Sequence, residues 1–257
     1  MFSATPAHWQ LISDLYRIDP MKKLPNKSQW QPQSATIKPS VHVALSYANN
    51  LIWQDTGKAT RALAHNDPVR VIQCPFTKVD FTAPSDSARP LLQTDGKRWW
   101  LLFDGVDDTM TYVFSFTSNH TIVAATEIVS VLSYPMITVT APINTELRCG
   151  VGGLLPEMIR SLSAAQGGSS ILNAKTVLIG EQDNTATVAR LSVNNGATIV
   201  STTFAGTISV SEHRVGARNN SQLFCNQKLY CSLLFGELLL GTKNQTVAYN
   251  YARKLFA

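Results

Sequence analysis

The stretch that decides the fold is residues 99–108, which read WWLLFDGVDD. An aromatic and apolar run ends in Phe103, and Asp104 and Gly105 follow at once. Short apolar runs bounded by Asp and Gly are typical of a buried β-strand that ends in a tight turn. The stretch therefore predicts a strand up to Phe103, a turn at Asp104–Gly105, and Phe103 as a core residue.

Strand-like segments continue on both sides of this stretch. The segment Asn194-Asn195-Gly196 is the strongest hairpin signal in the chain, because Asn and Gly adopt positive φ readily. Many short strands separated by turns are typical of a β-sandwich or barrel. The strands are expected over residues 41–46, 69–74, 99–103, 111–116, 121–132, 135–141, 175–180, 186–193, 197–204, 206–210, 214–217 and 228–235.

Two later segments have helical periodicity. Residues 154–166 are expected to form a short helix between strands, because their apolar residues fall on one helical face and Gly167-Gly168 follows. Residues 246–255 are expected to form a second helix, with Val247, Tyr251 and Leu255 on its apolar face.

The first 36 residues differ from the rest of the chain. Thr5-Pro6 is typical of a helix start, and the segment after Pro20 is polar and punctuated by proline. Residues 1–36 are therefore expected to form a docking arm, and residues 37–257 the sandwich domain. The arm either packs on its own domain or docks on a partner. Its docking side chains are expected to be Trp9, Ile12, Leu15, Tyr16 and Trp30.

The bulk composition limits the partners. The 257 residues are 44% hydrophobic and 15% charged with a net charge of +5, and Lys and Arg form no basic stripe interleaved with aromatic residues. No nucleic-acid partner is therefore expected. No apolar stretch is long enough to span a bilayer, and no secretory signal opens the chain, so synthesis in a cytoplasm without membrane insertion is expected.

The four cysteines, Cys74, Cys149, Cys225 and Cys231, fit no zinc or redox spacing. Free buried thiols are the expected state in a reducing compartment, and a pairing of Cys225 with Cys231 across a tight turn is left open.

Five stretches, in order, resemble the concanavalin A-like, laminin-G-like domains of bacteriophage virion structural proteins. The likeness covers about residues 38–257, and residues 103–108 (FDGVDD) are its most specific part. After Phe224 that family tends to have a glycine turn, whereas this chain has Cys225-Asn226-Gln227. The five stretches are residues 51–57, residues 67–69 with 87–90, residues 101–108, residues 189–196, and residues 215–234.

The resemblance implies an all-β, concanavalin A-like β-sandwich (jelly roll) with the N-terminal arm and a few short helices. It implies a virion structural protein that decorates a capsid or belongs to a tail, baseplate or fibre. Such a protein is made in the host cytoplasm, contacts other virion proteins, and forms a homo-oligomer or repeated array. The alternative is a glycan-binding module for host-cell attachment, which the fold supports by analogy.

The candidate contacts for a ligand or glycan are Trp99, Trp100, Asp104, Asp107 and Asp108. The two tryptophans point to opposite faces of a strand, so one is expected in the core and the other exposed or covered by the arm. The three carboxylates are able to bind Ca²⁺, but capping of backbone amides in the turn is the favoured interpretation. No other metal or cofactor is expected.

No motif in the sequence indicates catalysis. The glutamates are isolated, and neither a phosphate-binding loop nor a Gly-x-Ser-x-Gly elbow is present. The five histidines are far apart, and His120 and His213 are expected to be ordinary surface or half-buried residues. The sequence therefore predicts a protein that is not an enzyme, and a polysaccharide-cleaving enzyme with catalytic groups from distant positions is the least favoured alternative.

Overall fold

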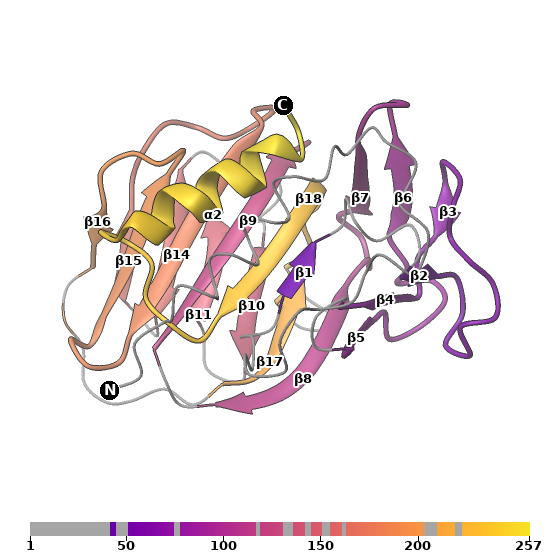
Figure 1. Cartoon of the computed structure of the whole chain (residues 1–257), viewed down its shortest axis with the longest axis horizontal. Helices are drawn as coiled ribbons and strands as arrows, with labels where there is room; N and C mark the ends of the chain where they lie inside the picture. The colour runs from indigo at the N-terminus through magenta and orange to yellow at the C-terminus, as the bar shows by residue number, and fades with distance from the viewer. Residues whose placement is uncertain are drawn as a thin grey trace.

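Two antiparallel sheets form the body of the protein (Figure 1). The computed structural model describes residues 42–44, 51–74, 78–116, 119–130, 136–141, 145–150, 155–160, 163–201, 203, 210–218 and 223–257. The expected arm, with Trp9, Ile12, Leu15, Tyr16 and Trp30, lies outside these residues.

Among the described residues, the first sheet, sheet A, has nine strands. Its order is β16-β15-β14-β9-β18-β7-β6-β3, and β1 pairs with β18 beside this path. The bounds are β16 Ile199–Val200, β15 Val188–Val193, β14 Thr176–Asp183, β9 His120–Ile128, β18 Asn226–Phe235, β7 Trp99–Asp104, β6 Leu91–Thr94, β3 Asp67–Pro68 and β1 His42–Ala44.

The second sheet, sheet B, also has nine strands, in the order β13-β12-β11-β10-β17-β8-β5-β4-β2. The bounds are β13 Ser163–Gln166, β12 Pro156–Arg160, β11 Thr145–Cys149, β10 Met136–Ala141, β17 Val210–Val215, β8 Met110–Phe116, β5 Asp80–Thr82, β4 Val71–Gln73 and β2 Ile52–Trp53.

The sheets pack face to face, and the space between them holds two clusters of buried apolar side chains. One cluster contains Phe103 with Leu101 and Leu229, and the other contains Leu191 with Leu147 and Met158. Phe103 and Leu191 have no exposed surface. The all-β sandwich predicted from the sequence is therefore confirmed, and the architecture agrees with a concanavalin A-like fold.

A single helix in the described residues, α2 (Lys243–Lys254), covers the outer face of sheet A (Figure 1). Ala248, Tyr251 and Leu255 pack on outward side chains of β9, β14 and β18 in a third apolar cluster. The Thr242 hydroxyl caps the helix by accepting a hydrogen bond from the Asn244 N–H. The predicted C-terminal helix is confirmed and begins three residues earlier than expected. In the part of the chain that the structure describes, no helix is long and apolar enough to cross a membrane.

A buried carboxylate fixes the loop that leads into α2. Glu181 on β14 accepts hydrogen bonds from the backbone N–H groups of Leu239 and Leu240 and from the Thr121 hydroxyl. Burial raises the pKa of Glu181, although these donors and Arg190 oppose the shift. The loop amides are thus satisfied by a side chain of the sheet on which the helix lies.

The turn predicted at Asn194-Asn195-Gly196 is confirmed by its backbone angles. Asn194 and Asn195 have φ of 50° and 60° in the turn after β15, as the hairpin prediction required. Asn66 likewise adopts positive φ, in the turn immediately before the short edge strand β3.

The helix predicted over residues 154–166 is wrong. Residues 156–160 and 163–166 form strands β12 and β13, which pair with each other. Met158 lies in the core between the sheets, and Glu157 pairs with Arg148 of β11. Apolar spacing of three and four residues fits a strand as well when partners from distant segments bury both of its faces.

The four cysteines are free and buried, so Cys225 and Cys231 are not paired. Cys225 belongs to the core between the sheets, and Cys231 belongs to the cluster beneath α2. The two thiols therefore lie on opposite faces of sheet A.

The turn after β7 packs tightly on the segment before β18. Gly216 has φ of 87°, and a Cβ there would overlap the ring of Phe103 and lie 2.9 Å from the Asp108 carbonyl oxygen. The Gly216 carbonyl accepts a hydrogen bond from Cys225 N–H at 2.8 Å, which leads the chain into β18. Gly216 therefore fixes how the turn after β7 packs on the segment that leads into β18.

Replacement of Gly216 by alanine tests this contact. Positive φ costs alanine about 1–2 kcal/mol, and the overlap with Phe103 adds about 1–3 kcal/mol. We expect Gly216→Ala to lower the free energy of unfolding in urea by about 2–5 kcal/mol. Gly96→Ala is the matched control, because Gly96 has φ of 85° and no atom within 4 Å of the added Cβ. Equal losses in the two variants would contradict the proposed packing of Phe103.

Candidate functional site

Strand β7 carries all five candidate residues at or just beyond its two ends. Trp99 and Trp100 begin the strand, and Asp104 ends it. At about 3.3 Å per residue, Trp100 and Asp104 lie about 13 Å apart along the strand. The tryptophans and the carboxylates therefore form two separate candidate sites.

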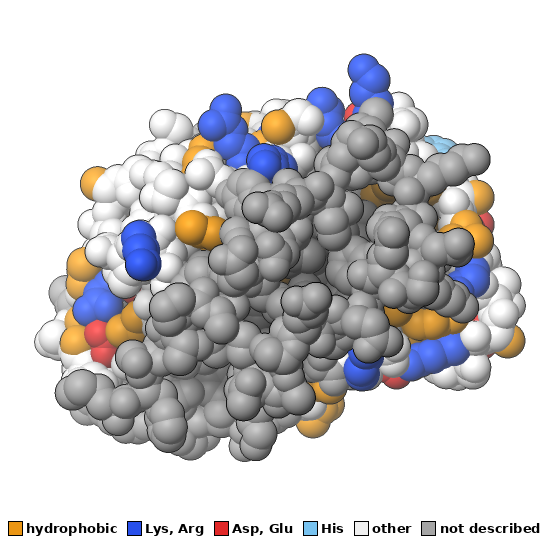
Figure 2. Space-filling view, in the orientation of Figure 1, with side chains coloured by type: hydrophobic (Ala, Val, Ile, Leu, Met, Phe, Trp, Pro, Cys, Tyr) orange, Lys and Arg blue, Asp and Glu red, His pale blue; other side chains and the backbone are white. Residues whose placement is uncertain are grey.

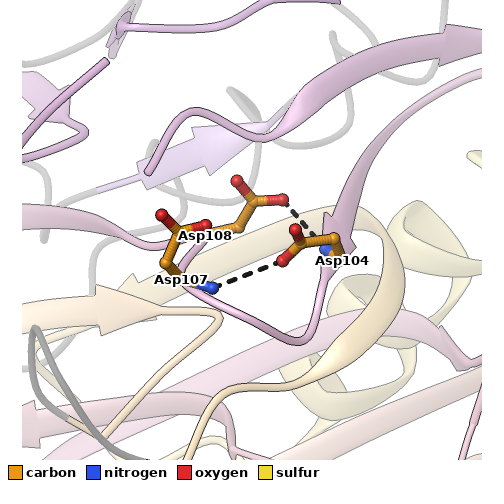
Figure 3. Close-up of side chains that lie close together, drawn as sticks. All are labelled: Asp104, Asp107 and Asp108. Atoms are coloured by element: carbon orange, nitrogen blue, oxygen red, sulfur yellow. Dashed lines mark hydrogen bonds between the residues drawn. The ribbon is translucent and has the colours of Figure 1, made fainter. Parts of the chain in front are cut away.

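The three carboxylates converge on the turn after β7 (Figure 3), with one oxygen of each within 4.8 Å of the others. Asp104 Oδ1 accepts hydrogen bonds from Val106 N–H at 2.7 Å and Asp107 N–H at 3.4 Å. Asp108 Oδ2 accepts one from Asp104 N–H at 2.9 Å. Asp104 and Asp108 thus cap backbone amides, as the capping interpretation expected, and binding of Ca²⁺ remains a prediction.

Asp108 is the buried member of this turn, with 5% of its surface exposed. Burial raises the pKa of Asp108 to about 7, and the nearby Asp104 and Asp107 add to the rise. The carboxyl group of Asp108 therefore gains a proton near neutral pH, which relieves repulsion among the three side chains.

The prediction for the two tryptophans is confirmed in its main point, since they lie on opposite faces of sheet A. Trp99 packs on the core between the sheets beside Leu101 and Phe103. Trp100 packs on the outer cluster, at its edge beyond the C-terminal end of α2. Both side chains are half-buried rather than one fully buried and one exposed.

Polar side chains from neighbouring strands surround Trp100 on the outer face. Gln93 is its direct partner on β6, and the ring of Tyr230 lies 5.9 Å from it. Lys228 Nζ lies 5.9 Å from the ring centroid and forms an ion pair with Glu127 at 2.9 Å. The indole N–H of Trp100 is buried and has no acceptor among the described residues. The site combines a partly exposed aromatic ring with amide, ammonium and carboxylate groups.

Sequence reasoning missed the neighbours of Trp100. Gln93, Glu127 and Lys228 come from three strands, and nothing in their local sequence marks them. The pairing of β18 with both β9 and β7, and of β7 with β6, brings them together.

The prediction that His120 and His213 are surface or half-buried residues is wrong. His120 and His213 are both buried, with 1% of their surface exposed. His213 Nε2 forms a hydrogen bond with the Ser232 hydroxyl at 2.9 Å, which joins the two sheets, and burial lowers the pKa of His213 to about 3. His213 is therefore a neutral core residue at neutral pH.

No family model matches the chain, and no curated protein matches it in sequence. Solved structures do match. A Trypanosoma rangeli sialidase in complex with 2,3-difluoro-KDN shares 11% identity at a TM-score of 0.58, and the match covers 97% of this chain and 38% of the sialidase. The same sialidase in complex with sialic acid gives 13% identity and a TM-score of 0.54, with 97% of this chain and 37% of the sialidase covered. The binding domain of botulinum neurotoxin serotype G gives 11% identity and a TM-score of 0.45 over 69% of this chain and 49% of that domain.

This chain therefore spans less than two-fifths of the length of the sialidases that it resembles. At such low identity the likeness shows the fold alone. It nevertheless contradicts the expectation that the chain is not an enzyme, because the solved structures of similar fold include sialidases, which are enzymes. That expectation rested on missing local motifs, which do not reveal catalytic groups assembled from distant positions.

The pH dependence of stability tests the state of Asp108. Its folded pKa is raised, so its contribution to stability is full below about pH 4 and is lost as the pH rises through about 7. Asp108→Asn keeps an acceptor for Asp104 N–H and removes the buried charge. We expect Asp108→Asn to match or exceed the wild type in urea midpoint at about pH 8, and the wild type to gain on it at about pH 5.

Asp86→Asn, which changes an exposed carboxylate, is the control and should follow the pH profile of the wild type. A loss in Asp108→Asn that is greatest at high pH would show that the charged carboxylate stabilises the turn, as it would with a bound cation.

Proposed function

We propose that this chain is a glycan-binding module and that its binding site is the outer face of sheet A around Trp100. The observation that carries the proposal is a half-buried tryptophan with polar side chains beside it. Aromatic rings pack against the apolar C–H faces of sugars, and a few well-placed polar groups fix the orientation of a ligand.

The polar groups around Trp100 suit hydroxyl ligands. The Gln93 amide donates and accepts, the Glu127 carboxylate accepts, and the Lys228 ammonium donates. Lys228 and Glu127 are part-exposed at 31% and 14% of their side-chain surfaces. The strands of sheet A hold these groups at fixed spacings, so a sugar meets a preorganised site.

The comparisons add support at the level of the fold. The sialidases with TM-scores above 0.5 include structures in complex with sialic acid and with the inhibitor DANA. A fold shared with proteins that bind sugars is compatible with the proposal, while the argument for binding rests on the Trp100 site itself.

We propose further that the module is a component of a virus particle, where it contacts other virion proteins and a host surface glycan. This part rests on the resemblance of residues 38–257 to phage virion domains. In that setting residues 1–36 attach the module to the particle, and repeated copies give the multivalency that weak sugar sites need.

Substitution of the two adjacent tryptophans tests the glycan site. Leucine retains apolar packing but removes the aromatic face. An aromatic contact contributes about 1–1.5 kcal/mol, so Trp100→Leu should weaken binding on a glycan array about tenfold. Trp99→Leu is the matched control on the opposite face and should bind like the wild type. Circular dichroism establishes that both variants are folded. Equal binding by the two variants, or no glycan bound by the wild type, would refute the proposal.

Deletion of residues 1–36 tests the attachment to a particle. We expect the shortened chain to keep the β-sheet circular dichroism spectrum and to be lost from purified particles, as measured by mass spectrometry. Undiminished incorporation would rule out an attaching role for this segment.

A further inference from the structure

The C-terminal end of α2 gathers positive charge from four distant parts of the chain. Arg98 Nε donates to the Ala257 carbonyl at 3.0 Å, and Lys175 Nζ donates to the Phe256 carbonyl at 3.2 Å. Both cations thus reach the residues that follow α2. Figure 2 shows Lys and Arg side chains along the upper edge of the molecule, where Figure 1 places this helix end and the β6–β7 hairpin.

We name the Lys and Arg side chains around the C-terminal end of α2 the basic end. This group contains more cations than carboxylates. Asp95 pairs with Arg98 at 3.4 Å, and Glu127 pairs with Lys228. These two are the carboxylate side chains that the described contacts bring to the group. Its six cations are Lys97, Arg98, Lys175, Lys228, Arg253 and Lys254.

Stabilisation of the helix accounts for only part of this charge. Cations near the last turn of a helix interact favourably with its dipole, which explains the contacts of Arg98 and Lys175 and the placement of Arg253. It gives no reason for Lys97, which is exposed at the tip of the β6–β7 hairpin, whereas Lys228 is held over the ring of Trp100 by its ion pair with Glu127.

The basic end is continuous with the Trp100 site. Lys228 Nζ lies 5.9 Å from the Trp100 ring, and Lys175 Nζ lies 6.0 Å from the ring of Tyr230, which itself contacts Trp100. Phe256 contacts the other side of this chain of rings, with its centroid 5.5 Å from that of Tyr230. A ligand that stacks on Trp100 therefore has the ammonium groups of Lys228 and Lys175 nearby.

We infer that the site selects acidic saccharides, with the carboxylate of the sugar held by the basic end while the ring of the sugar packs on Trp100. This inference rests on the proposed glycan-binding function and adds the charge of its ligand. Charge-assisted hydrogen bonds from Lys and Arg to a carboxylate are about twice as strong as neutral ones. A neutral sugar gains none of this interaction.

A nucleic acid suits the surface less well. Binding of a single strand depends on several exposed aromatic rings that stack successive bases. Here Tyr230 has 2% of its surface exposed, so Trp100 and Phe256 are the partly exposed rings of this group among the described residues. Two partly exposed rings with the buried Tyr230 between them form no continuous row of stacking platforms, so this cluster of cations fits a short charged sugar better.

Two pairs of probes that differ in their carboxylates test the inference on the full chain. Sialyllactose is compared with lactose, and a galacturonate trisaccharide with the galactose trisaccharide, by calorimetry at low and high salt. We expect the acidic member of at least one pair to bind about tenfold more tightly, with a preference that shrinks as salt screens the charges.

A double variant locates the selectivity. Lys97→Gln with Arg253→Gln should remove most of the preference for the acidic sugar, since two surface charges contribute about tenfold in total, and leave the binding of neutral sugar unchanged. The control removes the same charge elsewhere: Lys243→Gln with Lys78→Gln. Lys243 lies at the other end of α2, about 15 Å from Arg253 along the helix axis.

The outcomes separate the two proposals. Equal affinity for acidic and neutral probes, or equal effects of the two double variants, would overturn the charge preference and leave glycan binding standing. No binding of any saccharide would overturn both. Tighter binding of a single-stranded oligonucleotide than of either acidic sugar would replace the saccharide by a nucleic acid as the ligand of the basic end.

Discussion

The burial of sheet A on both faces is the constraint on which the rest of the structure depends. Every residue of β14 is buried, as are almost all residues of β9 and the last seven of β18. Sheet B covers one face of these strands and α2 covers the other. The loop that leads into α2 lies on this buried face, so its backbone N–H groups need acceptors from the protein itself. Glu181 provides one by accepting hydrogen bonds from the N–H groups of Leu239 and Leu240.

The same constraint creates the candidate site. The outer face of sheet A is core beneath α2 and becomes surface beyond the C-terminal end of α2, where β7 and β6 continue the sheet (Figure 1). Trp100 stands at this boundary. Its ring completes the apolar cluster on one side, while Gln93, Lys228 and Glu127 lie around it on the other. The site therefore exists because a short helix covers only part of a wide sheet.

The parts of the fold that could be predicted are those with local causes. The turn after Phe103 and the hairpin at Asn194–Asn195 depend on backbone angles that few residue types adopt, so the sequence marks them. The strand over residues 99–103 and the opposite faces of Trp99 and Trp100 follow from the twofold repeat of a strand. The prediction of a helix over residues 154–166 failed because β11 and β15, which are distant in sequence, pack against residues 156–160 and favour a strand there. Local sequence does not reveal these partners.

The candidate site shows the same limit of reasoning from local sequence. It also explains why the prediction that the chain is not an enzyme failed. Trp100 was identified from its type and its place in a strand, but its polar neighbours come from β6, β9 and β18, far apart in the chain. A binding cluster assembled across strands in this way leaves no motif. Catalytic groups assembled across strands would leave none either, so the absence of local motifs excluded motif-based enzymes only. The geometry defines a rigid, positively charged edge of sheet A with partly exposed aromatic rings. The shape and charge of this edge determine which ligand binds there.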